Sequence, residues 1–206
     1  MKTMRIPPYW QDATNYLTLQ DEVMAGLIAS YAVEVLLNHD NPLQTLMRAV
    51  VGQQISVKAA EAIWQRLERQ LETISAPQSL AVGEDDLRQC GLSRQKIGYL
   101  TAIARAFEAG TLTPSTWKRM SDEEVVTQLV GIRGIGQWTA EMFLIFHLHR
   151  PDVLPLSDLG LLKAIRLHYG HLSESEILTL SQRWQPYRTV ATWYLWRSLD
   201  PGTVQY

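Results

Sequence analysis

Apolar residues recur three and four positions apart along most of this chain, which is the spacing of amphipathic α-helices. The clearest runs cover residues 42–51, which open with a proline, residues 57–71, and residues 94–109, which follow a serine and stop at Gly110. Ser121 and Ser173 each stand three positions before a glutamate, a pairing that caps helix N-termini. No alternating run bounded by hairpin turns stands out beyond a short stretch near the N-terminus. The sequence therefore predicts an all-α fold.

Three of the 12 glycines fall within six positions, in the stretch LVGIRGIGQWTAEMF at 129–143. They are Gly131, Gly134 and Gly136, and helical patterns flank them on both sides. Residues 121–146 are therefore predicted to form a helix-hairpin-helix. The alternative is an ordinary pair of helices joined by a turn, which requires only one glycine, at the end of the first helix.

The predicted hairpin has the features of a site for the DNA backbone. Glycine lets a phosphate approach the backbone N–H groups at a helix N-terminus, because no Cβ stands in the way. An arginine at the tip can add a charge-assisted contact to a phosphate. We therefore expect contacts to the DNA backbone from Gly131, Arg133, Gly134, Gly136 and Thr139.

Composition and charge limit the class of protein. Hydrophobic residues make up 46% of the 206 residues, enough for one large core or two small ones. The single cysteine, Cys90, excludes a disulfide within the chain and any zinc or iron–sulfur site made of four thiolates. The net charge of −2 gives no overall attraction to phosphate, so nucleic-acid binding has to come from a local surface. The absence of a signal-like start and of a bilayer-length apolar stretch favours a soluble, cytoplasmic protein with no membrane partner.

Asp158 is a candidate functional residue outside the hairpin. It stands in the stretch PDVLPLSDLGLLK at 151–163, directly before a helical pattern that ends at Gly170. A carboxylate in this position can simply cap the helix, because it accepts backbone N–H bonds and complements the helix dipole. The neighbouring motifs decide between that structural role and a chemical one.

Together, LVGIRGIGQWTAEMF and PLSDLGLLK resemble the helix-hairpin-helix DNA glycosylases, in particular the branch that acts on alkylated bases (3-methyladenine DNA glycosylase II). The resemblance extends to VVGQQISVKAAEAIWQRL at 50–67, GLSRQKIGYLTAIA at 91–104 and RWQPYRTVATWYLWR at 183–197. It implies two helical subdomains with the lesion pocket in a cleft between them. Residues 42–150 would form one subdomain, and residues 1–41 would join residues 151–206 to form the other, which carries the catalytic aspartate.

For catalysis, the resemblance points to two positions. The catalytic aspartate of the family falls on Asp158: breaking an N-glycosidic bond builds positive charge on the deoxyribose, which a fixed carboxylate stabilises while it orients water. Bifunctional relatives place a lysine nucleophile where this chain has Trp138, and an indole cannot form a Schiff base. The implied enzyme is a monofunctional glycosylase without lyase activity. It would flip 3-methyladenine- and 7-methylguanine-type purines out of duplex DNA and excise them in base excision repair.

Side chains that hold the flipped base are also implied by the resemblance. A cationic purine stacks well on electron-rich rings. The expected pocket residues are Trp138, Trp196, Met142, Tyr187 and Trp193. The two tryptophans at 193 and 196 stand three apart in a helical pattern and also suit a helical core.

Two glutamines, Gln53 and Gln54, stand where the family inserts a side chain into the gap left by the flipped base. Gln54 is the expected plug, and a solvated or helix-capping glutamine is the alternative for either position.

No cofactor is expected, although the resemblance implies a monovalent cation, Na⁺ or K⁺, at the carbonyl groups of the hairpin. The expected partner is double-stranded DNA that contains alkylated bases, and the protein is expected to be a monomer. It would work in the cytoplasm at the nucleoid of a prokaryote, or in the nucleus of a eukaryote. Two alternatives stay open: a hairpin module that binds DNA without chemistry, and a glycosylase for deaminated or etheno purines.

Overall fold

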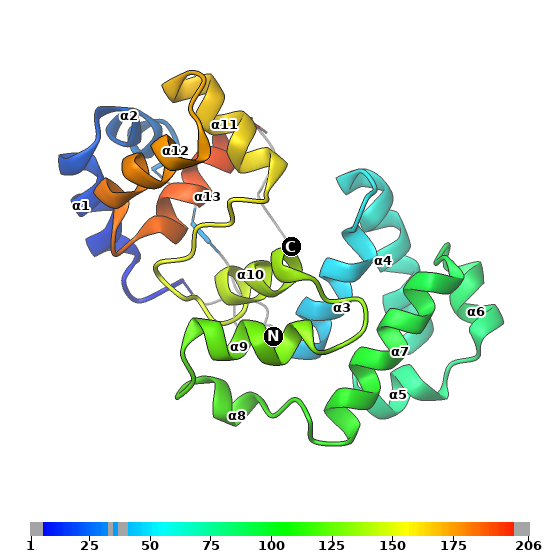
Figure 1. Ribbon diagram of the computed structural model, residues 1–206. Coiled ribbons are helices and arrows are strands. Elements are labelled where there is room, and N and C mark those ends of the chain that lie inside the picture. The colour runs from blue at the N-terminus through cyan, green and yellow to red at the C-terminus, as the bar shows by residue number, and fades with distance from the viewer. Residues whose placement is uncertain (1–5, 33–34, 37–40, 200–206) are drawn as a thin grey trace. The chain divides into compact units, whose positions relative to one another are not determined.

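The computed structural model describes residues 6–32, 35–36 and 41–199, and all regular structure in these ranges is helical. Residues 1–5, 33–34, 37–40 and 200–206, which belong to the predicted terminal segments, lie outside the described residues. The all-α prediction is confirmed (Figure 1). Near the N-terminus, where the sequence gives a weak strand signal, the chain is helical in the regular structure that is described. No helix in the described ranges is both long and apolar enough to cross a membrane.

The chain divides into two compact units. The terminal unit combines the chain up to residue 38 with the chain from residue 144 onward, and the inserted unit is residues 39–143. The terminal unit contains α1 (Trp10–Gln20), α2 (Glu22–Ser30), α11 (Leu159–Tyr169), α12 (Glu174–Ser181), the 3₁₀ turn η1 (Gln182–Trp184) and α13 (Arg188–Leu199). The inserted unit contains α3 (Pro42–Gly52), α4 (Val57–Leu71), α5 (Ala76–Ala81), α6 (Glu84–Gln89), α7 (Arg94–Glu108), α8 (Pro114–Trp117) and α9 (Asp122–Val130). The division falls within α10 (Gln137–Phe146).

Helix starts follow the capping residues that the sequence displays. Ser93 accepts a hydrogen bond from the backbone N–H of Lys96 at the start of α7. Complete capping boxes form at Ser121 and at Ser173, as predicted. Each cap satisfies backbone donors that have no partner inside the helix, which fixes where the helix begins.

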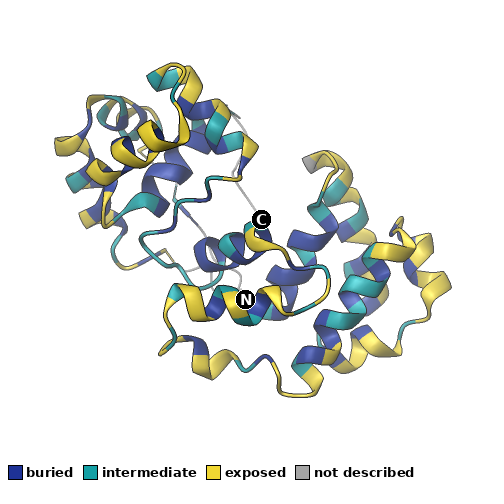
Figure 2. Ribbon diagram, viewed as in Figure 1, coloured by how far each residue is buried: buried dark blue, intermediate teal, exposed yellow. Residues whose placement is uncertain are grey.

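Helix α13 is the centre of the terminal unit. It packs against α1, α2 and α11, so that segments far apart in the sequence lie side by side. Residues 189–197 are all buried, and α13 is dark blue over this length in Figure 2. A helix that is covered on every side in this way holds its side chains in fixed positions.

Helices α3 and α7 form the centre of the inserted unit. They pack against each other, while α4 covers α3 and the short helices α5 and α6 cover α7. The apolar stripe predicted for residues 42–51 is buried at Leu43, Leu46, Met47 and Val50.

Candidate functional site

Asp158 is buried at the N-terminus of α11. Its Oδ1 atom accepts hydrogen bonds from the backbone N–H of Leu161, at 2.6 Å, and from the indole Nε1–H of Trp196, at 2.7 Å. Asp158 and Trp196 are each only 8% exposed. The first bond is the helix cap that the sequence predicts, and the second ties the carboxylate to α13.

The indole of Trp196 is held on its edge and on one face. Its edge donates to the carboxylate, and its ring stacks on Phe146 with centroids 5.8 Å apart and planes inclined by 11°. The family resemblance implies that Trp196 lies against the flipped base. In the structure its indole N–H donates to Asp158 and its ring stacks on Phe146.

Two other expected pocket residues lie in the packing of the terminal unit. Trp193 is 1% exposed and makes edge-to-face contacts with Trp10 and Tyr194, at 5.2 and 5.0 Å between centroids. It is a core residue, which corrects its expected place in the pocket. Tyr187 packs against Tyr9 and Tyr16 from the N-terminal segment, at 6.2 and 5.6 Å between centroids.

The other two expected pocket residues lie on α10. Trp138 is the second residue of this helix, directly after the hairpin, and is half-buried. Met142 stands one turn later and is 1% exposed.

A second buried aspartate caps a helix in the terminal unit, and the sequence did not single it out. Oδ1 of Asp21 accepts from the backbone N–H groups of Val23 and Met24, while Oδ2 accepts from the hydroxyl of Tyr169 at 2.9 Å and from Nε1 of Trp184 at 3.0 Å. Burial, and then the nearby carboxylate, raises the pKa of Tyr169, which keeps its hydroxyl protonated as a donor. The one sequence signal for this site is an aspartate directly before a helical pattern.

The hairpin glycines differ in whether their positions have room for a side chain. Gly134 has a φ of +96°, and a Cβ placed on it would stand 2.2 Å from the Tyr99 ring of α7. Gly136 is exposed, and a Cβ there would meet nothing within 4 Å. Gly131 caps α9 in the ordinary right-handed conformation. Packing against Tyr99 therefore requires glycine at position 134, a reason that the sequence interpretation did not include, while Gly136 offers an open approach to the backbone.

The adjacent glutamines have different positions. Nε2 of Gln53 donates to the carbonyl of Gly134 and to Oγ1 of Thr139, both at 3.1 Å, and so braces the hairpin. Thr139 is 2% exposed and its Oγ1 accepts from Gln53, so any contact to a phosphate would have to come from its backbone rather than its side chain. Gln54 lies in the turn between α3 and α4, is exposed, and has a φ of +60°.

Lys96 on α7 also holds the turn between α3 and α4 in place. Its Nζ donates to the carbonyls of Val51 and Gln53, at 2.7 and 2.8 Å, where α3 ends. Burial lowers the pKa of this amine. The turn that presents Gln54 is therefore attached to both the hairpin and α7.

Three of the hairpin carbonyls already accept a hydrogen bond within the chain. The carbonyl of Ile132 accepts from Ile135, that of Gly134 from Gln53, and that of Gly136 from Ala140. In the ranges that the structure describes, no group of three or more His, Cys, Asp or Glu side chains could hold a metal ion.

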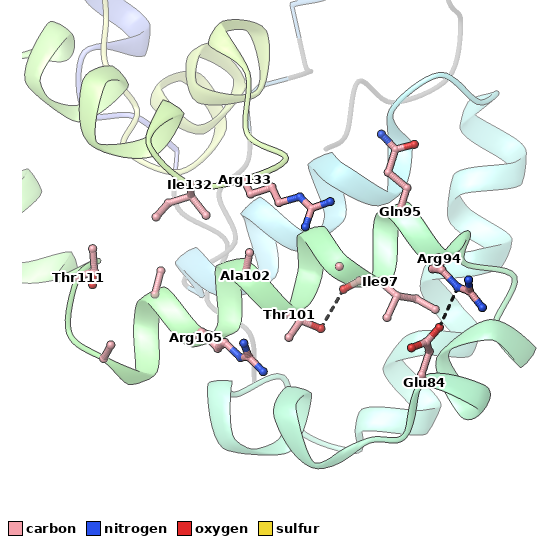
Figure 3. Close-up of a pocket in the computed structure, with 13 residues that line it drawn as sticks. Glu84, Arg94, Gln95, Ile97, Thr101, Ala102, Arg105, Thr111, Ile132 and Arg133 are labelled. Carbon is pink, nitrogen blue, oxygen red and sulfur yellow. Dashed lines mark hydrogen bonds and ion pairs between the residues drawn. The ribbon is translucent and has the colours of Figure 1, made fainter.

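A groove of about 1020 Å³ runs along α7 in the inserted unit (Figure 3). Three arginines line it, Arg94, Arg105 and Arg133, and Glu84 opposes the first of them at 3.4 Å. Arg133 extends from the hairpin over α7. The groove contains none of the residues expected to handle the base, so its positive lining is a surface beside the hairpin rather than the reaction centre.

The sequence also matches a family model. The model of the HhH-GPD superfamily of base excision DNA repair proteins matches residues 47–188. The chain belongs to the HhH-GPD superfamily. The matched part includes the hairpin and Asp158, and it ends before Trp196.

Relatives within the HhH-GPD superfamily extend this assignment. The chain is similar to DNA-3-methyladenine glycosylase 1 of Schizosaccharomyces pombe, with 36% identity over 184 residues that cover 85% of this chain and 80% of the relative. The solved 3-methyladenine DNA glycosylase of that yeast, in complex with abasic DNA, gives a TM-score of 0.77 at 33% identity and covers 91% of this chain and 96% of its own. The DNA-3-methyladenine glycosidase of Bacillus halodurans also gives 0.77, at 33% identity, with 95% and 92% covered.

Proposed function

We propose that this protein is a DNA glycosylase that excises alkylated purines from duplex DNA in base excision repair. Membership of the HhH-GPD superfamily and similarity to 3-methyladenine DNA glycosylases support this function. The observation that carries it is the buried Asp158 carboxylate, held by the N-terminus of α11 and by Trp196. A module that only binds DNA requires no such group, because phosphate contacts call for positive charge and backbone N–H donors.

The reaction is hydrolysis of the bond between C1′ of the deoxyribose and a ring nitrogen of the purine. Alkylation makes the base cationic, so it departs as a neutral molecule with the bonding electron pair. Positive charge then develops on the sugar, where the carboxylate of Asp158 stabilises it. Water adds to C1′ and loses a proton, which leaves an abasic site.

Holding the flipped base calls for an electron-rich ring, and Trp138 is our first candidate. It is half-buried at the start of α10, and tryptophan offers the strongest cation–π face. Gln54 is our candidate for the side chain that fills the vacated position in the duplex, because it lies on a turn that Gln53 and Lys96 hold in place. Gln54 also has a positive φ, and strained backbone conformations of this kind cluster at functional sites.

Base release without strand cleavage is the expected result with duplex DNA that carries one methylated purine. The product strand should stay intact until alkali is added, because Trp138 offers no amine for a Schiff base. The measurement is release of the free base together with the length of the strand, and unmodified duplex is the control. Strand cleavage without alkali, or a covalent complex trapped by borohydride, would refute the monofunctional assignment. Binding without base release would favour the module that only binds DNA.

Gly134 and Gly136 of the hairpin give a matched pair of variants. Gly136→Ala should keep the free fold intact and weaken binding to lesion and undamaged duplex alike, because its methyl group intrudes only where a phosphate would approach. Gly134→Ala should instead lower stability by roughly 1–3 kcal/mol, because of the positive φ and the clash with Tyr99. Thermal unfolding and binding titrations separate these effects. A Gly136→Ala variant that binds undamaged duplex normally would contradict the phosphate role.

We further propose that the protein acts as a monomer. It would meet its DNA in the cytoplasm of a prokaryote or in the nucleus of a eukaryote. A glycosylase for deaminated or etheno purines is the alternative within the same chemistry, and duplexes that each carry one defined lesion distinguish the two.

A further inference from the structure

A glycine occupies the second position of α11, two residues after Asp158. A Cβ on Gly160 would stand 3.0 Å from Oδ1 of Asp158, and 3.3 and 3.4 Å from Cδ1 and Nε1 of Trp196. These are the two atoms of the hydrogen bond between carboxylate and indole, together with the carbon beside the donor. Distances this short to a Cβ are tighter than ordinary packing contacts, so an added methyl group would have to displace one partner.

Helix formation alone gives no reason for glycine at this position. Alanine is the better helix former, and the φ of Gly160 lies outside the left-handed region that favours glycine. Gly26, in α2 of the same unit, is a helical glycine at which an added methyl group would meet nothing within 4 Å. The contrast assigns the requirement at position 160 to the contact between Asp158 and Trp196.

The indole cannot easily give way to a methyl group. Trp196 is buried, and its ring stacks on Phe146. Movement of the much smaller carboxylate group is the easier response, and it would distort the 2.7 Å bond from Nε1. The displacement required is a few tenths of an ångström, and the rate of a reaction depends steeply on the position of a reacting group.

We propose that Gly160 and Trp196 are positioning residues for Asp158. The indole N–H fixes one carboxylate oxygen, and the missing side chain at position 160 leaves room for that bond. The inference rests on the proposed function, because only a catalytic carboxylate makes this placement matter for rate. It extends that function by assigning Trp196 to the carboxylate rather than to the base.

The test is the Gly160→Ala variant, compared with Gly26→Ala. Gly160→Ala should slow single-turnover release of 7-methylguanine by about tenfold or more, while the Kd for the same duplex stays within about twofold. The indole N–H resonance of Trp196 in ¹⁵N-labelled free protein should move, because its hydrogen bond is disturbed. Gly26→Ala should change neither the rate nor this resonance.

A second variant separates positioning from packing. Trp196→Phe removes the indole donor while it keeps an aromatic ring against Phe146, and it should also slow base release. If both residues act through the same bond, the double variant should be no slower than Trp196→Phe alone, because the two changes remove one interaction.

Three outcomes would overturn the inference. They are a normal rate in Gly160→Ala, an unmoved indole resonance, and a loss confined to DNA affinity, which would mean that the glycine serves close approach of DNA. Failure of the proposed function is distinguishable from these. In that case the wild type would release no base, while the indole resonance would still move in Gly160→Ala.

Discussion

Asp158→Asn should slow base release by roughly 10²-fold or more while the protein stays folded. The amide oxygen of Asn can accept the same two hydrogen bonds, from Leu161 and from Trp196, and Asn caps helices about as well as Asp. Only the negative charge is lost, and that charge stabilises the developing cation on the sugar. Single-turnover kinetics with a duplex that carries one methylated purine measure the effect.

Binding and stability provide the controls for this variant. Affinity for the duplex should stay near that of the wild type or rise, because a negative charge facing phosphate is removed. Asp158→Ala should in addition lower stability by about 1 kcal/mol through loss of the cap. If Asp158→Asn excises the base at a near-normal rate, then the carboxylate is a structural cap and the catalytic assignment is wrong.

Asp21→Ala should have the opposite effect to Asp158→Asn. It should lower stability by a large amount and change the rate of base release per folded molecule little. The substitution leaves the Tyr169 hydroxyl and the Trp184 indole as buried donors without their acceptor, and it removes the cap of α2. We expect a loss of roughly 3 kcal/mol or more. Thermal unfolding should show this as a midpoint lower by about 6–12 °C.

Asp12→Asn is the control for this second experiment. Asp12 also lies in the first turn of a helix in the terminal unit, but it is exposed, so the change should lower stability by less than about 0.5 kcal/mol. An unfolding midpoint that hardly moves in Asp21→Ala would show that the four hydrogen bonds contribute little. Asp21 would then be one helix cap among many.

Helix positions could be predicted from the sequence because their signals are local. Capping serines, an opening proline and apolar residues at helical spacing determine where a helix starts and which face is buried, and these signals lie within a few residues of each other. The capping role of Asp158 was predictable for the same reason. Its position before α11 is visible in the sequence without any knowledge of α13.

Partners that are distant in the sequence could not be predicted. Nothing near Gly134 indicates that Tyr99 fills the space beside it, and nothing near Gln53 indicates that its amide braces the hairpin. Trp193 and Trp196 show the same limit, because both suit a buried helix, and only the packing of α13 decides which indole reaches the carboxylate. Residues 1–41 carry little motif signal, so Asp21 could not be singled out there.

The division of the chain into a terminal and an inserted unit has a consequence for protein synthesis. The inserted unit is continuous, so all of it is synthesised before α11, α12 and α13 of the terminal unit, and domains generally fold as units during translation. Asp21 must wait for partners that are made 148 and 163 residues later. Asp158 gains its indole partner only when α13 emerges. A nascent chain therefore contains its hairpin before the carboxylate of Asp158 is held in place. A chain truncated before α13 would have the hairpin but would lack the indole partner of Asp158.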